Sequence, residues 1–289
     1  MKKQIVGIVV LMLVATTVVS ATNINVKKDI QPTASGVDVP VWKKGDSWTY
    51  NCHWINYAYD NSGTLWYMEN YNDTETRTVT DDTGNNYTMK TTGKITDGRT
   101  TFGKYLFKFT PFTKIIDDFV LRKTDLGTFQ EFYQEKGLVF WLIGSIGLPI
   151  PVQYTHFYEI NFTPPYRTLP FPFDAGTPGT IPGGSDIYRE KASLFWGLIT
   201  LSNSPAKSYP YSPVTYHCEM ANITIPAGTY NAYNISIDYT YGLGSTHIWR
   251  YYVPELGYVA KIHETADWDS TGKPGTIWEY ELVSTTYTP

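Results

Sequence analysis

Three pairs of carboxylates are the residues in this sequence whose type and spacing could do chemistry. The pairs are Asp267 with Asp269, Glu279 with Glu281, and Asp117 with Asp118. Glycoside hydrolysis needs an acid and a base about 5 to 10 Å apart, and residues two apart share one face of a strand. Such pairs are more often solvated strand edges, and the sequence holds no metalloprotease, nucleophile-elbow or phosphate-loop motif. We therefore predict no catalytic residue and no cofactor.

The two cysteines, Cys52 and Cys218, each have a histidine as a neighbour, in Asn51-Cys52-His53 and His217-Cys218-Glu219. Two cysteines and two histidines can hold zinc. Both segments are typical of strands, where adjacent side chains point to opposite faces, so an adjacent Cys and His would not converge on one ion. In an exported chain a solitary pair favours a disulfide, with free thiols and a metal site as the alternatives.

The first 21 residues have the pattern of an export signal. Two lysines precede an apolar run from Ile5 to Val19, and Ser20 and Ala21 suit a signal peptidase. An uncleaved membrane anchor is the alternative, because a bilayer crossing needs about 20 apolar residues. We predict a signal peptide or anchor over 1–21, a flexible linker over 22–40 and a β-rich extracytoplasmic domain over 41–289. The protein is then secreted, or held at the cell surface by its anchor.

Charge argues against a nucleic-acid partner. The whole chain has 23 Lys and Arg against 27 Asp and Glu, a net charge of −4, and removal of Lys2 and Lys3 with the signal makes it −6. Phosphate backbones are bound by clustered basic side chains, which this sequence does not show. The sequence gives no indication of the oligomeric state.

Aromatic and β-branched runs predict a mainly β fold. The chain has 24 Tyr, 13 Phe and 9 Trp, and short runs of such residues alternate with Gly, Asn, Asp and Pro. Hairpin turns are predicted at 81–84 and 96–98. One or two short helices are predicted over 110–120 and 185–200, because apolar residues there recur at helical spacing.

An internal similarity raises the question of two repeated halves. Residues 132–139 resemble 252–259, each read as an aromatic strand, a Glu-x-Gly turn and an apolar strand. Shared turn chemistry explains this as well as an old duplication does. A duplication would put the boundary near 144–152.

Three segments carry a family resemblance. Residues 223–235 hold a Pro-Ala-Gly-Thr turn, 249–261 hold a Tyr-Tyr-x-Pro-Glu-x-Gly hairpin, and 41–50 resemble an opening strand. Together they resemble uncharacterised exported β proteins of the lipoprotein-carrier (LolA/LolB-like) superfamily. The resemblance implies a curved antiparallel sheet, a half-barrel or sandwich, with a concave apolar face that in the carriers accommodates acyl chains. The greater length of this chain and its extra 171–184 loop depart from that pattern.

An uncharged stretch after Lys136 has the character of a binding surface. The candidate residues for ligand or membrane contact are Phe140, Trp141, Ile143, Ile146, Leu148 and Ile150. Exposed, they would form an apolar patch of the kind that monomers keep for partners, ligands or membranes. The alternative is a buried strand followed by a covered loop.

Five sequons suit glycosylation of an exported chain. Their asparagines are Asn72, Asn86, Asn161, Asn222 and Asn234. Unmodified asparagines in strands and turns are the alternative, because the motif is short.

Taken together, these features predict an exported, non-enzymatic cell-envelope protein that binds an apolar or lipid-like ligand on a concave β face. A membrane surface is a further candidate partner. The alternatives are a structural surface glycoprotein and, less favoured by the sequence, a glycan-directed hydrolase.

Overall fold

The computed structural model describes residues 36–60, 62–143, 148–241, 244–269 and 272–289. The predicted signal and most of the predicted linker lie outside these ranges. The strands are β1 (Ser47–Tyr59), β2 (Leu65–Asp81), β3 (Asn86–Phe102), β4 (Tyr105–Phe109), β5 (Lys114–Arg122), β6 (Thr128–Ile143), β7 (Leu148–Tyr166), β8 (Gly179–Ile181), β9 (Gly184–Leu194), β10 (Ile199–Tyr211), β11 (Val214–Ile225), β12 (Gly228–Tyr241), β13 (Gly244–Val253), β14 (Tyr258–Asp267) and β15 (Pro274–Thr285). Two single-turn 3-10 helices, η1 (Phe195–Gly197) and η2 (Pro254–Leu256), complete the elements. Nothing helical in the described part of the chain is long and apolar enough to cross a membrane.

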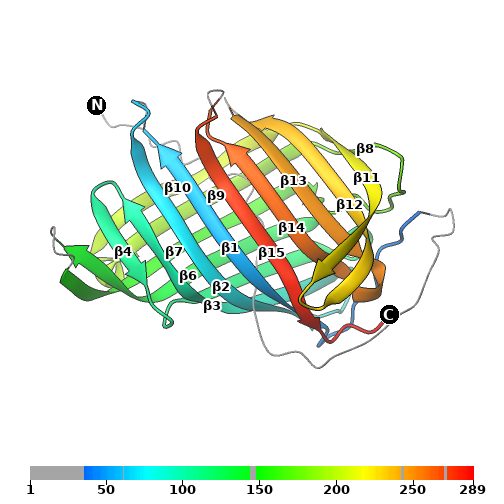
Figure 1. Cartoon of the computed structure of the whole chain (residues 1–289), viewed down its shortest axis with the longest axis horizontal. Coiled ribbons are helices and arrows are strands. Elements are labelled where there is room, and N and C mark those ends of the chain that lie inside the picture. The colour runs from blue at the N-terminus through cyan, green and yellow to red at the C-terminus, as the bar shows by residue number, and fades with distance from the viewer. Residues whose placement is uncertain (1–35, 61, 144–147, 242–243, 270–271) are drawn as a thin grey trace.

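All fifteen strands join in one antiparallel sheet, which confirms the predicted fold class of a curved sheet in a half-barrel or sandwich. The order is β10-β9-β7-β6-β4-β3-β2-β1-β15-β14-β13-β12-β11-β8, and β5 pairs with β3 and β6. The sheet folds over itself. Figure 1 shows β1 and β11–β15 in a front layer, with β6, β7, β9 and β10 crossing behind them at a steep angle.

A bent two-stranded ribbon carries the chain between the layers. Two residues separate β8 from β9, and two separate β10 from β11, while β8 pairs with β11 and β9 with β10. Gly183 lies at this bend, where an added Cβ would come 2.6 Å from the Tyr211 carbonyl oxygen. The close crossing therefore requires glycine.

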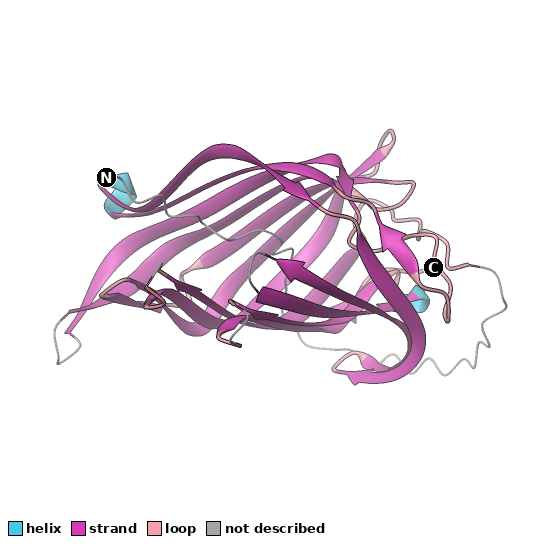
Figure 2. Ribbon diagram, turned by 90° about the horizontal axis from the view of Figure 1, so that it is seen from above, coloured by secondary structure: helices cyan, strands magenta, loops and turns pink. Residues whose placement is uncertain are grey.

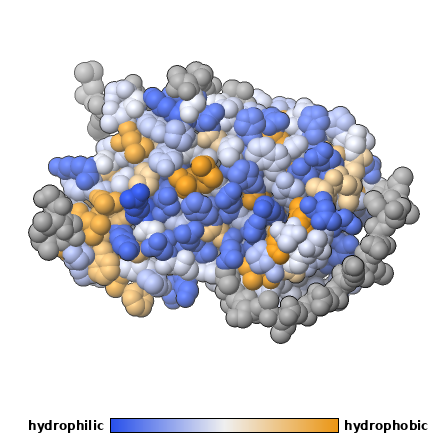
Figure 3. All heavy atoms as spheres, viewed as in Figure 1, coloured by the Kyte–Doolittle hydropathy of each residue, from blue (hydrophilic) through white to orange (hydrophobic). Residues whose placement is uncertain are grey.

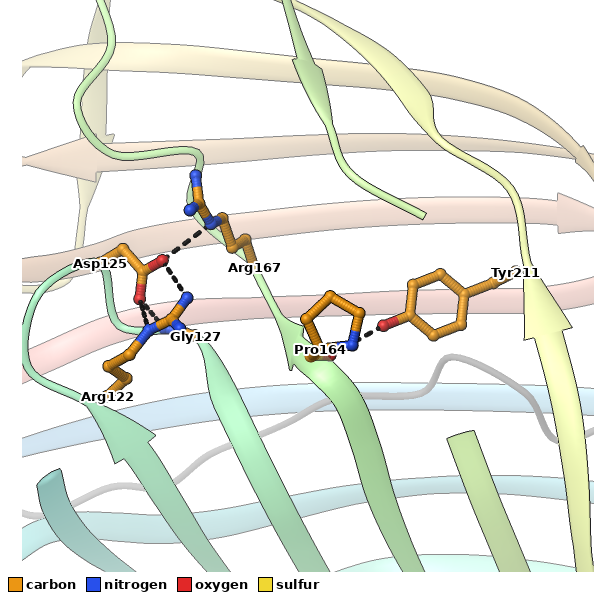
Figure 4. Close-up of polar contacts among 6 residues, drawn as sticks. All are labelled: Arg122, Asp125, Gly127, Pro164, Arg167 and Tyr211. Carbon is orange, nitrogen blue, oxygen red and sulfur yellow. Dashed lines mark hydrogen bonds and ion pairs between the residues drawn. The ribbon is translucent and has the colours of Figure 1, made fainter. Parts of the chain in front are cut away.

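A clasp of charged groups fixes the β5–β6 turn near the same end (Figure 4). Arg122 donates two hydrogen bonds to Asp125, at 2.7 and 2.6 Å, and Arg167 pairs with Asp125 at 2.8 Å. Burial opposes ionisation of Asp125, but the hydrogen bonds from Arg122 and Gly127 and the two arginine charges lower its pKa overall. Nearby, the Tyr211 hydroxyl donates to the Pro164 carbonyl at 3.2 Å, which ties β10 to β7.

Buried aromatic side chains fill the space inside the fold. Trp48 donates from its indole nitrogen to the Leu256 carbonyl at 2.6 Å, and the Tyr50 hydroxyl donates to the Val259 carbonyl at 2.9 Å. Trp42 packs against the rings of Trp48, Tyr87 and Tyr258. Each such side chain removes a large apolar area from water and satisfies its polar atom on the backbone.

The predicted helices are not present. Residues 114–122 form β5, in which Ile115, Asp117 and Phe119 are buried and their neighbours are less so. This is the period of a strand, and pairing with β3 and β6 overrides the helical spacing of the same apolar residues. Residues 184–194 likewise form β9, followed by the single turn η1.

Of the predicted turns, the one at 81–84 is confirmed between β2 and β3, and the one at 96–98 is wrong. Residues 96–98 lie within β3 at a register irregularity opposite Asn72 and Asp73. The Glu-x-Gly turn expected at 135–137 is also absent, because β6 continues through it, whereas 255–257 does form a turn. The similarity between 132–139 and 252–259 therefore does not extend to the backbone.

Gly93 is expected to be irreplaceable in the middle of the sheet. A Cβ at this position would lie 2.1 Å from Glu75 Cγ and 2.5 Å from the Thr74 carbonyl oxygen. Since buried overpacking costs about 1–3 kcal/mol, Gly93→Ala should lower the free energy of unfolding by at least that amount. Urea denaturation measures it, with Gly36→Ala, where the added Cβ meets only Asp174 at 3.4 Å, as the control. Equal stability of the two variants would contradict this packing.

Candidate functional site

The hairpin of β6 and β7 presents part of the predicted contact segment to solvent. Phe140 pairs with Pro151 and Trp141 with Ile150 across this hairpin. Phe140 is 38% exposed and Ile150 is 42% exposed, and Trp141 is half-buried. Ile146 lies outside the described residues, as do the side chains of Ile143 and Leu148. The alternative of a fully buried strand does not hold for Phe140 and Ile150.

Other exposed apolar side chains gather at the same end of the sheet. We call this group the apolar end: Leu65, Trp66, Tyr105, Leu138, Phe140, Ile150, Trp196, Leu198 and Ile199. They come from the β1–β2, β3–β4, β6–β7 and β9–β10 connections and the strands beside them. Figure 3 shows hydrophobic residues massed at the left of the molecule, where Figure 1 places β4. In Figure 2, η1 lies at the opposite end from the C-terminus.

Contacts between neighbouring connections hold the apolar end together. The Gly103 amide donates to the Trp66 carbonyl at 2.6 Å, and the ring of Tyr105 packs on Trp141 with centroids 5.6 Å apart. On the other side, the Trp196 amide donates to Gln153 Oε1 at 3.0 Å. The apolar side chains thus project from a connected base.

The β9–β10 connection presents the most exposed apolar residues of the described chain. Trp196 is 81% exposed and Leu198 is 86% exposed. Phe195 and Trp196 have φ values of 50° and 57°, a left-handed conformation that side chains with a Cβ rarely adopt. The tip thus combines an unfavourable backbone conformation with a tryptophan exposed to water.

Inside the fold lies a group of buried ionisable side chains, which we call the interior polar layer. Its members are Glu69, Glu75, Arg77, Asp117, Glu131, Glu135, His156 and Glu190. They occupy inward-facing positions, which alternate with outward ones, on β2, β5, β6, β7 and β9. They lie between two apolar clusters, and Trp54 and Tyr133 pack against both of these.

Arg77 is the only arginine of this layer, and it is fully buried, with a relative exposure of 0%. Its guanidinium lies 5.4 to 5.7 Å from the ring centres of Tyr50, Phe119, Tyr258 and Tyr280, and Nη1 donates to the Tyr258 hydroxyl at 3.0 Å. Burial raises the pKa of Glu75, Asp117 and Glu131, and the Arg77 charge opposes that rise in each. Arg77 therefore supplies a positive charge that favours the ionised form of each of these buried carboxylates.

His156 is held between two glutamates. Its Nε2 lies 3.1 Å from Glu190 Oε1, and its Nδ1 lies 3.7 Å from Glu135 Oε2. Burial opposes the charge on His156, but its interactions with Glu135 and Glu190 raise its pKa well above the usual value. Nearby, burial and then the charge of Glu135 raise the pKa of Glu69 to about 8.

The interior polar layer does not have the access that hydrolysis requires. Glu69, Asp117, Glu131 and Glu135 are at most 3% exposed, so a glycan could not reach a pair of them without opening of the sheet. No cluster in the described part of the chain could hold a metal ion.

Two of the three carboxylate pairs noted in the sequence contact basic side chains of neighbouring strands. Asp117 points inward, whereas Asp118 pairs with Lys90 at 2.9 Å. Glu279 pairs with His263 at 2.8 Å, and Glu281 with Lys261 at 2.5 Å. These contacts lie on the outer face of the sheet.

The predicted disulfide is not formed. Cys52 lies on β1 and Cys218 on β11, and no bond joins their sulfurs. Four strands stand between β1 and β11, which places these two strands about 24 Å apart along the curved sheet, and a disulfide needs Cα atoms within about 7 Å. Both thiols are buried, and burial raises the pKa of Cys218 to about 11.

The five sequons differ in access. Asn72, Asn86 and Asn222 are exposed and Asn161 is half-buried. Asn234 is buried, and its amide donates to Glu219 at 3.2 Å. A glycan on Asn234 would replace one of its two amide hydrogens at a buried position.

Comparison of the chain with family models, with curated proteins and with solved structures gave no match. The LolA/LolB-like resemblance therefore stays a prediction.

Sequence reasoning missed both the full extent of the apolar end and the interior polar layer. The helix predicted over 185–200 includes Trp196, although its position before Gly197 is also typical of an exposed turn. The alternation Glu69, Tyr71, Asp73, Glu75, Arg77 was a signal for the interior layer, because it places one kind of side chain on one face of a strand.

Proposed function

We propose that this chain is an exported, non-enzymatic protein of the cell envelope that binds lipid, and that it does so at the apolar end rather than on the concave face. The observation that carries the proposal is the convergence of exposed apolar side chains from four connections on one end of the sheet. Tryptophan and tyrosine favour the boundary between headgroups and acyl chains, where their rings are part apolar and part polar.

The concave face is a weaker candidate for the ligand. Its inward positions carry large buried aromatic side chains and the carboxylates of the interior polar layer. Acyl chains would have to displace the aromatic side chains. At the interior polar layer they would meet carboxylates to which they cannot hydrogen-bond. A purely structural surface protein, in turn, gives no reason to hold Trp196 and Leu198 in water.

Loss of the β9–β10 tip should weaken binding to phosphatidylcholine vesicles. Replacing Trp196 and Leu198 together by serine removes most of the apolar area of this tip, and about tenfold weaker binding is expected for each 1.4 kcal/mol lost. Flotation of the purified exported protein with vesicles measures it. Brominated phosphatidylcholine should quench the tryptophan emission of the parent protein more than that of Trp196→Phe.

Val41→Ser provides the control, because Val41 is 73% exposed and lies before β1, at the opposite end of that strand from the β1–β2 connection. It should bind like the parent. Unchanged flotation of the Trp196→Ser, Leu198→Ser double variant, together with unchanged quenching in Trp196→Phe, would overturn the proposed function.

A further inference from the structure

Three lysines lie directly opposite one another on the outer face of the sheet. Lys94 on β3 pairs in register with Lys114 on β5, which pairs with Lys136 on β6. All three are exposed, and no described carboxylate lies within ion-pair distance of any of them. We call this set the lysine row. Opposed residues on neighbouring strands have Cβ atoms about 5 Å apart, so three like charges are concentrated here.

The lysine row adjoins the apolar end. Lys136, Leu138 and Phe140 follow one another along the outer face of β6, so about 13 Å separates Lys136 from Phe140 along the strand. Lys108 pairs with Phe140 from β4, and Arg99 pairs with Lys108 from β3. Lys104 lies at the β3–β4 turn, with Nζ 5.5 Å from the centre of the Tyr105 ring. Basic side chains thus border the exposed apolar residues on one side.

This arrangement has a cost in the free protein. Like charges directly opposite one another destabilise a sheet, and the chain as a whole is acidic, with a net charge of −4. The one described carboxylate close to these bases is Asp97, which is 4.0 Å from Lys108. An anionic partner outside the chain would remove the repulsion.

From this geometry we propose that the lysine row binds the headgroups of anionic lipids, so that the apolar end selects negatively charged membranes. The inference rests on the proposed function and names its lipid class. Basic side chains within about 10 Å of an anionic bilayer are attracted to it, and apolar side chains beside them enter the same surface. A nucleic acid would use the charges but leave the adjoining apolar residues, Leu138 and Phe140, in water.

The test compares phosphatidylcholine vesicles with vesicles that contain phosphatidylglycerol. The parent protein should bind the anionic vesicles at least about tenfold more tightly at low salt, and 0.5 M NaCl should remove most of the difference. Lys114→Gln combined with Lys136→Gln should lower the anionic preference and leave binding to phosphatidylcholine unchanged. The same variant should also unfold at a higher temperature than the parent, because a repulsion is removed.

Lys43→Gln combined with Lys44→Gln is the matched control, since it makes the same change of charge ahead of β1, away from the apolar end. It should keep the anionic preference. Equal binding of both vesicle types by a parent protein that does bind phosphatidylcholine would refute this inference and leave the proposed function standing. A lysine-dependent affinity for single-stranded DNA that exceeds the affinity for anionic vesicles would also refute it.

Discussion

Replacing Arg77 by methionine should lower the free energy of unfolding by about 3–5 kcal/mol at pH 7.5, which is the usual effect of removing one partner from buried charges. The guanidinium opposes the raised pKa values of Glu75, Asp117 and Glu131, and none of these residues is more than 1% exposed. Without Arg77 they must take up protons or stay charged in an apolar interior. Either outcome costs free energy at neutral pH.

The stability that Arg77→Met removes should depend on pH and on the presence of Asp117. At pH 5.5 the carboxylates are more easily protonated, so the same substitution should cost less than at pH 7.5. Asp117→Asn added to Arg77→Met should restore part of the stability, because it removes one of the charges left behind. Arg77→Lys should be less stable than the parent protein, since an ammonium group cannot stack in a planar fashion among four rings.

Urea denaturation at the two pH values measures these differences. Arg99→Met, an exposed arginine on β3, is the control and should change stability by less than about 0.5 kcal/mol. If Arg77→Met fails to fold at pH 7.5, the double variant and the lower pH provide the comparison. A loss below about 1 kcal/mol at both pH values would show that Arg77 does not compensate these carboxylates.

The β class could be predicted from the sequence because strand composition is a local property. Runs rich in Tyr, Thr and Val alternated with turn residues, and the turn at 81–84 was found where the Asp-Asp-Thr-Gly stretch put it. The secondary-structure prediction failed where strand pairing decides between helix and strand. Ile115, Ile116 and Phe119 fit a helix as well as a strand, and only the partners on β3 and β6 resolve the choice.

The apolar end could be predicted in part because a chain segment carries its own hydrophobicity. Phe140 and Ile150 stood out in an uncharged stretch, and both are exposed. Trp66, Tyr105 and Trp196 come from connections far apart in sequence, and only the strand order brings them together. The lysine row has the same origin, since Lys94, Lys114 and Lys136 are neighbours through register alone. The disulfide prediction failed for this reason too, because sequence gives no measure of the four strands between the two cysteines.

The folded protein should be most stable near pH 5 and should lose stability steadily between pH 5 and pH 8.5. Burial raises the pKa of Glu69 to about 8, of Glu264 to about 7 and of Asp186 to about 6. The interactions of His156 with Glu135 and Glu190 raise its pKa despite burial. Over this range the folded chain therefore binds more protons than the unfolded chain, so the free energy of unfolding falls as pH rises.

The groups with lowered pKa act in a different range. In Asp125, Glu159 and Glu190 burial is outweighed by hydrogen bonds from arginine or histidine, and the pKa is lowered overall. Their contribution is complete above the unfolded values of about 4 to 4.5 and is lost only as pH falls below them. These groups therefore determine how stability falls at acid pH. Above pH 5 the change of the free energy of unfolding with pH comes from the buried groups whose pKa is raised.

Glu69→Gln isolates the largest printed shift in this set. One pKa unit corresponds to about 1.4 kcal/mol, so the rise from 4.5 to about 8 makes ionisation of Glu69 cost a few kcal/mol in the folded state. At about 2–4 °C of Tm per kcal/mol, the parent should melt roughly 10 °C lower at pH 8.5 than at pH 5. Glu69→Gln cannot ionise and should show a shallower fall. Asp97→Asn, which removes the same charge from a carboxylate that is 73% exposed, should keep the parent's slope. A parent Tm that is level or rising from pH 5 to 8.5 would mean that these carboxylates are not held protonated by burial, and the interior polar layer would then have to be hydrated.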